Sequence, residues 1–111
     1  MTTERATQSG RLGVSLPPDT GELFDEVARL GAVRIEEITS SVTPDTAPQL
    51  QDHDEWVVLL SGFAELELEG EARTLVPGDW LLLPAGTAHR VLRTGVGSRW
   101  LAVHAPAAES D

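Results

Sequence analysis

Two proline–glycine turns enclose a short, fully apolar segment in the second half of the chain. The turns contain Pro77-Gly78-Asp79 and Pro84-Ala85-Gly86, and the residues between them are one Trp and three Leu. Proline donates no ladder hydrogen bond and glycine adopts positive φ at little cost, so a turn is predicted at each end. The apolar run fits a strand packed on both faces, and residues 87–93 return to alternation. His89 is thereby predicted just inside a strand start, where small β-barrels keep their ligand sites.

Period-two patterning dominates the chain from residue 32 onward. Short alternating or apolar segments recur about every ten residues, separated by Gly or Pro turns, at 33–39, 55–60, 64–69, 73–76, 80–83, 88–93 and 99–104. This spacing predicts an all-β sandwich or a closed jelly-roll barrel. Glu65, Glu67 and Glu69 alternate on one strand, and we expect them to face water because three like charges on one face repel.

One short helix is predicted before the first of these strands. Asp19 or Thr20 is a suitable N-cap after two prolines, and apolar residues then recur at helical spacing until Gly31. We expect this helix to lie against the barrel wall.

Length and composition favour one domain without a membrane segment. The chain has 111 residues, of which 41% are hydrophobic, and contains no apolar run of membrane-spanning length. The N-terminus has no apolar signal-peptide core, so a cytoplasmic location is expected. We predict a single domain over residues 14–105, with flexible tails at 1–13 and 106–111.

The charge and the missing residue types exclude several classes of function. The net charge is −10, and all eight basic residues are Arg. Nucleic-acid and anionic-membrane partners are therefore not expected. The absence of Lys removes Schiff-base chemistry, and the absence of Cys removes thiolate catalysis, disulfides and iron–sulfur clusters.

The turn-rich segment resembles the second conserved motif of the cupins, which reads G, five residues, P-x-G, two residues, H, three residues, N. Gly78, Pro84, Gly86 and His89 stand at the required spacing, and Arg93 replaces the final Asn. The resemblance implies the cupin double-stranded β-helix, a jelly-roll barrel.

The first cupin motif, G, five residues, H-x-H, three or four residues, E, six residues, G, is matched only in its second half. Glu55 and Gly62 fit, but Gln49 and Gln51 replace the two histidines and Thr43 replaces the first glycine. In metal-binding cupins the two histidines and the glutamate of this motif bind the ion together with the histidine of the second motif. Here amide oxygens replace two imidazoles, so a divalent ion (Zn, Fe, Mn or Ni) is expected to bind weakly or not at all.

His53 leaves a second metal set open. We favour an exposed histidine in the polar turn Asp52-His53-Asp54. If its ring instead faces inward, His53, Glu55 and His89 would form a 2-His-1-carboxylate set, with Gln51 as a further metal ligand. His104 shares a strand face with Trp100 and Ala102, where it either packs or lines the barrel mouth.

Without a metal, Glu55 and His89 form a candidate acid–base pair, or a buried ion pair with no catalytic duty. Gln49 and Gln51 are candidate ligand-binding residues. Arg93 lies four residues after His89 and is expected to share its face, where it would bind a substrate carboxylate or phosphate or pair with an acidic residue.

Three hypotheses about function follow. The first is a small cupin that binds a small organic molecule in its barrel, as a metal-independent or weakly metal-dependent isomerase, cyclase or lyase. The second is a metallo-cupin such as an oxygenase, and the third is a non-catalytic metabolite- or sugar-binding module. Trp56 should face out of the barrel, and since cupins commonly form dimers, the resemblance implies a homodimer.

Overall fold

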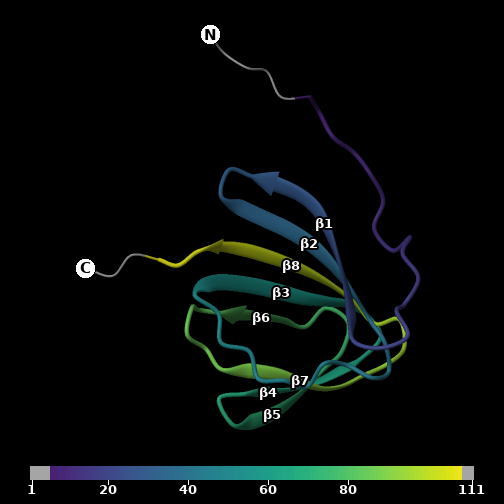
Figure 1. The fold of residues 1–111 in the computed structure, drawn as a ribbon, viewed down its shortest axis with the longest axis vertical. Coiled ribbons are helices and arrows are strands. Elements are labelled where there is room, and N and C mark those ends of the chain that lie inside the picture. The colour runs from purple at the N-terminus through teal and green to yellow at the C-terminus, as the bar shows by residue number, and fades with distance from the viewer. Residues whose placement is uncertain (1–5, 109–111) are drawn as a thin grey trace.

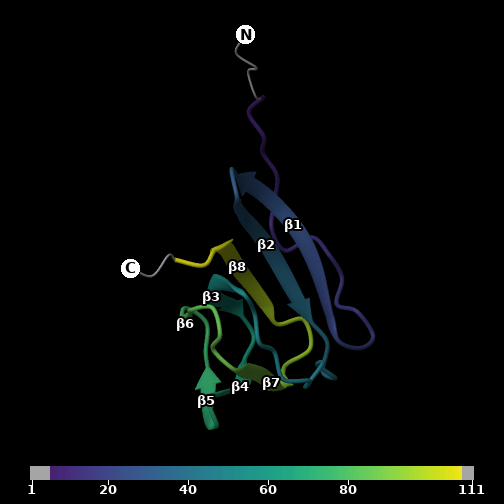
Figure 2. The same ribbon diagram turned by 60° about the vertical axis from the view of Figure 1, so that its left-hand side comes forward.

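The computed structural model describes residues 6–108 and contains two antiparallel β-sheets that face each other (Figures 1 and 2). The five-stranded sheet has the order β1(Glu22–Leu30), β2(Val33–Ser40), β8(Arg99–Pro106), β3(His53–Ser61), β6(Trp80–Leu83). The three-stranded sheet has the order β5(Glu71–Leu75), β4(Ala64–Leu68), β7(His89–Thr94). The all-β jelly-roll prediction is confirmed. The tails predicted at 1–13 and 106–111 fall partly on residues 1–5 and 109–111, which lie outside the described residues.

The predicted N-terminal helix is wrong, because residues 22–30 form the edge strand β1. Leu30 pairs with Val33 across a two-residue loop, and Gly31 has φ +60° as the first residue of that loop. Gly31, which the sequence pattern predicted as the end of a helix, therefore allows the tight turn of a β-hairpin. Pairing with β2 satisfies the β1 backbone groups that face β2. Val27, which fitted the helical spacing, is the extra residue of a bulge. Within residues 6–108 no helix forms.

The core lies between the two sheets. Alternating residues of each strand point inward, as the period-two pattern requires. The buried apolar residues are Val57, Leu59, Ala64, Leu66, Leu75, Leu83, Trp100 and Ala102. Trp100 keeps its polar atom satisfied, since its Nε1–H donates to Ser40 Oγ at 3.0 Å.

The glycine of the turn between β3 and β4 allows a close approach of two segments. Gly62 has φ +87°, and a Cβ at this position would lie 2.8 Å from the Cα of Ser98. Ser98 is fully buried, and its Oγ bonds the backbone of Phe63 and Gly95. The glycine shared with the first cupin motif thus serves packing rather than chemistry.

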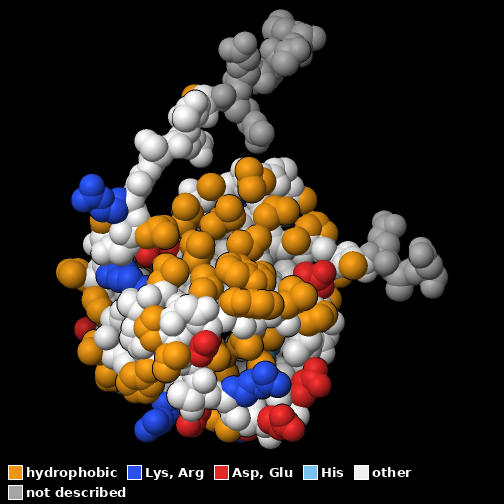
Figure 3. Space-filling model, turned by 180° about the vertical axis from the view of Figure 1, so that it is seen from behind, with side chains coloured by type: hydrophobic (Ala, Val, Ile, Leu, Met, Phe, Trp, Pro, Cys, Tyr) orange, Lys and Arg blue, Asp and Glu red, His pale blue; other side chains and the backbone are white. Residues whose placement is uncertain are grey.

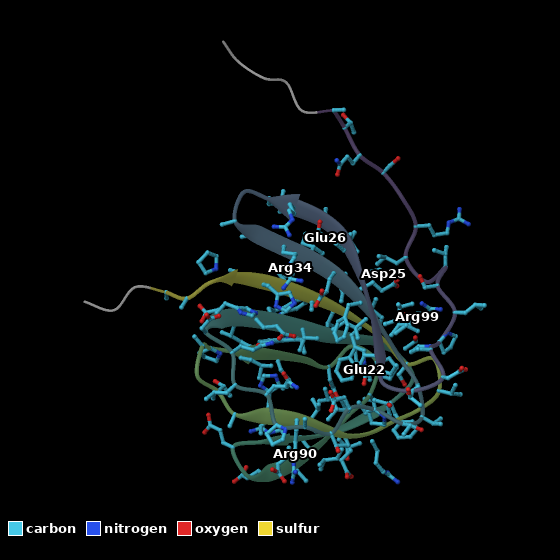
Figure 4. The ribbon with its side chains drawn as sticks, viewed as in Figure 1. Glu22, Asp25, Glu26, Arg34, Arg90 and Arg99 are labelled. Atoms are coloured by element: carbon cyan, nitrogen blue, oxygen red, sulfur yellow. The ribbon has the colours of Figure 1, made fainter. Side chains whose placement is uncertain are left out.

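The segment before β1 lies against the outer side of the five-stranded sheet. Gly13 N–H donates to Glu37 Oε2 at 2.8 Å, and Arg99 donates to the Ser15 carbonyl at 2.6 Å. The Ser15 hydroxyl bonds Asp25. Figure 4 shows Asp25 and Arg99 beside this segment.

Among residues 6–108 there is no helix that could span a membrane.

Candidate functional site: a cavity between the sheets

A cavity of about 430 Å³ lies between the two sheets, with walls contributed by both. Its apolar walls are formed by Phe24, Ile38, Val57, Leu66, Leu68, Leu81, Leu83, Val91 and Trp100. Its polar and charged side chains include Glu22, Glu36, Asp45, Gln49, Gln51, Glu55, His89 and His104. No arginine lines it within the described part of the chain. The cavity thus combines apolar walls with a few polar groups, as small-molecule sites do.

The register of β8 places three ionisable residues on one wall. Glu55 of β3 pairs directly with His104, and Glu36 of β2 pairs with Ala102, two residues away from His104. Residues opposite each other in an antiparallel ladder share a face, and their diagonal neighbours remain within reach of long side chains. Glu36, Glu55 and His104 are therefore buried side by side.

His104 connects these residues through both of its ring nitrogens. Nε2 lies 2.8 Å from Glu36 Oε1, and Nδ1 lies 2.9 Å from His53 Nε2 and 3.9 Å from Glu55 Oε1. Glu36 accepts the hydrogen bond, so Nε2 carries a proton and Nδ1 is the acceptor of the neutral ring. Nδ1 can then accept a hydrogen bond from His53 Nε2–H or bind a cation.

Glu36 is held in its charged form. Burial would raise its pKa, but the hydrogen bond from His104, together with the charge and hydrogen bond of Arg34, outweighs burial and lowers that pKa below the usual value. Arg34 Nη1 lies 2.9 Å from Glu36 Oε2. A carboxylate that is charged at neutral pH therefore orients the His104 ring.

His89 enters the cavity from the start of β7, at the place expected from the turn pattern. It exchanges two backbone hydrogen bonds with Gln49, at 2.7 and 3.1 Å. Its Nδ1 lies 3.0 Å from the Thr87 carbonyl, which only accepts, so Nδ1 carries the proton. The neutral ring keeps Nε2 as its free acceptor, which suits a base or a metal ligand.

Gln51 is tied to the turn that precedes β7. Its carbonyl accepts a hydrogen bond from the Gly86 N–H at 2.8 Å. The structure thus brings Gln49, Gln51, Glu55 and His89 to one cavity, as the cupin resemblance implies.

Arg93 does not enter the cavity, so the expectation that it shares the face of His89 is wrong. Leu92 is an extra residue in the pairing of β7 with β4, and it reverses the alternation after Val91. Arg93 is consequently exposed, with its guanidinium 5.9 Å from the centre of the Phe63 ring.

The interpretation of His53 as an exposed turn residue is also wrong. His53 is the first residue of β3, and its ring centre lies 5.0 Å from that of His104. The alternative of an inward ring therefore holds, but among the described residues the ring joins Glu55 and His104 and not the expected set with His89. The sequence pattern did not predict Glu36 as a site residue, because it stands among apolar residues of an alternating strand. Only the register of β2 shows that its side chain faces the cavity.

The residues at the cupin metal positions do not suit a transition metal. Two of the four are amides, which are neutral and weak donors compared with imidazole. A different group, His53, Glu55 and His104, offers two imidazoles and a carboxylate whose ligand atoms all lie within 4.8 Å of one another.

A further carboxylate, Glu22 of β1, lines the cavity. Burial raises its pKa, as does nearby Asp45, while the hydrogen bond from the Ser40 hydroxyl lowers the pKa to a smaller extent than burial raises it. Its Oε1 is buried without a hydrogen-bond partner among the described residues. A ligand hydroxyl or ammonium group could satisfy this oxygen.

Comparison with known proteins identifies the family. Residues 41–104, more than half of the chain, match the model of the cupin domain. A proposed mannose-6-phosphate isomerase from Ralstonia eutropha JMP134 is 36% identical over 91% of this chain and 100% of that chain, with a TM-score of 0.78. KdgF from Halomonas sp. is 26% identical over 79% of this chain and 82% of that chain, with a TM-score of 0.72.

A protein of Aquifex aeolicus without an assigned function is 40% identical over 55 residues, which cover 50% of this chain and 46% of that protein. The chain thus spans about half the length of this curated relative. The motif positions, the two facing sheets and these similarities agree, and the chain belongs to the cupin family.

Proposed function

We propose that this cupin is an enzyme that binds a small, hydroxyl-bearing molecule in its cavity and transfers protons on it, in an isomerisation, cyclisation or lyase-type reaction. The observation that carries the proposal is that Glu55 and His89 line one largely apolar cavity while the Thr87 carbonyl holds the His89 tautomer. This arrangement offers a free imidazole nitrogen and a buried carboxylate to the same ligand.

The two groups suit reciprocal proton transfer. An isomerisation needs a base that removes a proton from one carbon and an acid that returns a proton at the neighbouring carbon. His89 Nε2 can remove the first proton, and the imidazolium so formed can return a proton at the neighbouring carbon while the Glu55 carboxylate in the same cavity balances its charge. The apolar walls reduce competition from water. Gln49 and Gln51 stand at the same cavity to bind ligand hydroxyl groups.

The charge of the cavity narrows the substrate class. Four acidic residues line it, and the positive groups that usually clamp a phosphate are absent from its described lining. The name of the Ralstonia relative supports a sugar-sized substrate and an isomerisation. The acidic lining favours an uncharged or cationic ligand over a sugar phosphate.

The test begins with a thermal-shift screen of uncharged sugars and polyols. A ligand at 100 times its dissociation constant stabilises the protein by about 2.7 kcal/mol. Each hit is then incubated in D2O, and deuterium incorporation at carbon is followed by NMR. Glu55→Gln and His89→Gln should each lower the exchange rate at least about 100-fold.

Glu67→Gln is the matched control, because Glu67 pairs with Arg90 and does not line the cavity. Full exchange in Glu55→Gln would overturn the proposal, and binding without exchange would leave a non-catalytic binding module.

Metal-dependent chemistry is a second candidate function. It is favoured by the His53, Glu55 and His104 group, whose donor types suit a divalent first-row ion.

We also propose that the protein forms a homodimer through the outer face of the five-stranded sheet. Trp56 pairs with Val103 and Leu82 on the two neighbouring strands, and Val58 next to it pairs with Leu101 and Trp80. These six residues, named the outer apolar face, form two adjacent rows across β8, β3 and β6. Trp80 and Leu82 are each 60% exposed. Figure 3 shows that hydrophobic side chains cover much of one side of the molecule. Such exposed apolar area is typical of an interface.

A further inference from the structure

We propose that His53, Glu55 and His104 form a binding site for one divalent transition-metal ion, which shares Glu55 with the cupin motif but takes both of its histidines from other positions. The ligand atoms would be His53 Nε2, His104 Nδ1 and Glu55 Oε1. Two of them, the imidazole nitrogens, lie 2.9 Å apart, and Glu55 Oε1 lies 3.9 Å from His104 Nδ1. The inference does not depend on the proposed proton transfer, because metal binding is measured without a substrate.

The spacing of the three atoms suits an ion between them. Metal–nitrogen and metal–oxygen bonds of about 2.0 to 2.2 Å place neighbouring ligand atoms roughly 3 to 3.5 Å apart. The observed separations lie on both sides of this range, and all three atoms are within 4.8 Å of one another. Closing onto an ion therefore asks for side-chain shifts of about 1 Å, within the reach of rotamer adjustment.

The hydrogen bond on the far side of His104 supports a metal-binding role. Metal-binding histidines typically donate their other ring N–H to a carboxylate, which sets the tautomer and increases the basicity of the ligand nitrogen. His104 does so to Glu36 at 2.8 Å, and Arg34 in turn anchors Glu36. His104 Nδ1 is thereby presented as a donor before any ion arrives.

His53 can release the proton on its Nε2 when an ion binds there. Its Nε2–H donates to His104 in the metal-free protein, and metal binding requires this proton to leave Nε2. The neutral ring keeps the proton by moving it to Nδ1, which lies 3.4 Å from Asp52 Oδ1. The ion then replaces the shared proton as the link between the two imidazoles.

The donor types identify the class of ion. Two imidazoles and one carboxylate suit Zn²⁺, Co²⁺, Ni²⁺ or Fe²⁺ rather than Mg²⁺ or Ca²⁺, which prefer all-oxygen sites. Glu55 and Glu36 together balance the charge of a divalent ion. Glu55 and His104 line the cavity, so the remaining coordination positions would face a ligand there.

The test is a titration of the chelator-treated full chain with ZnCl2 and with CoCl2, followed by calorimetry and by the visible absorption of Co²⁺. We expect one ion per chain. His53→Ala and His104→Gln should each weaken binding at least 100-fold, and Glu36→Gln should weaken it about 10- to 100-fold. His89→Ala is the control, since it removes the one histidine of the cupin positions and should leave metal affinity within about threefold.

A wild-type measurement guards against variants that fail to fold. In ¹H–¹⁵N spectra of the histidine rings, Zn²⁺ should shift His53 Nε2 and His104 Nδ1 and leave the His89 nitrogens unchanged. Metal loss in His89→Ala with retention in His53→Ala would place the ion at the cupin positions and overturn the proposal. An absence of binding at millimolar metal would overturn it as well.

Discussion

Glu55 of β3 lies directly opposite His104 of β8, and 3.9 Å separates Glu55 Oε1 from His104 Nδ1 in the wall of the cavity. Each residue is only 7% exposed. A carboxylate and an imidazole at this depth need partners, because an isolated buried charge is costly. His53 and Glu36 supply them for His104. Glu55 belongs both to this cluster and to the cupin motif, so it connects the two halves of the candidate site.

Gly62→Ala should destabilise the protein by about 2 to 4 kcal/mol, because an added Cβ meets the Ser98 backbone at a φ that side chains rarely adopt. Gly70→Ala is the matched control, with the same φ of +87° and nothing within 4 Å of its Cβ. We expect it to cost only about 1 to 2 kcal/mol. Urea denaturation compares the two free energies of unfolding. Equal losses would show that the close approach to Ser98 adds nothing to the backbone strain.

Glu22→Gln should stabilise the protein at neutral pH by up to about 1 kcal/mol, a figure reduced for the partial exposure of the side chain. Burial raises the pKa of Glu22, so the folded state binds its proton more tightly than the unfolded state does. At pH values above the pKa of Glu22 in the folded state, the charged carboxylate therefore lowers the free energy of unfolding. As the pH falls through that pKa towards the pKa of the unfolded state, Glu22 becomes protonated and this loss of stability disappears. The gain from Glu22→Gln should fade in the same interval. Thermal unfolding from pH 4 to pH 8 measures it, with exposed Glu71→Gln as the control. A gain that does not vary with pH would contradict the assignment.

A phosphate group on the sugar should weaken its binding to the cavity. The acidic lining repels a phosphate, and no arginine among the described lining residues compensates for it. We expect the phosphate monoester to bind at least about tenfold more weakly than the parent sugar, with the difference shrinking as salt screens the charges. Calorimetry at low and high ionic strength measures both affinities. Tighter binding of the phosphate ester would exclude the proposed substrate class.

The double substitution Trp80→Glu with Leu82→Glu should convert a homodimer into a monomer. Both side chains belong to the outer apolar face and are exposed, so the added charges disfavour association while leaving the core intact. Sedimentation velocity measures the change in mass. Leu50→Glu is the control, because Leu50 is 73% exposed but lies outside the outer apolar face. A wild-type protein that sediments as a monomer at all concentrations would refute the dimer.

Local sequence signals predicted much of the fold. Proline and glycine at Pro77, Gly78, Pro84 and Gly86 restrict the backbone of their own turns, so their meaning does not depend on distant residues. The position of His89 at the start of β7 followed from that segment alone. The same local argument failed for residues 22–30, where the spacing of apolar residues fitted a helix but pairing with β2 supplied the backbone partners.

The sequence by itself determined the all-β architecture and the place of His89 at a strand start, because turn residues and two-residue alternation act over a few residues. The meeting of Glu55 and His89 at one cavity followed from the resemblance to the cupin motifs. Tertiary structure alone decided that Glu55 lies beside His104, that Glu36 orients that ring and that Arg93 turns outward. Those outcomes depend on the register of strands far apart in the chain and on one bulge. A shift of a single residue in a strand exchanges its inner and outer faces, and no local pattern specifies that shift.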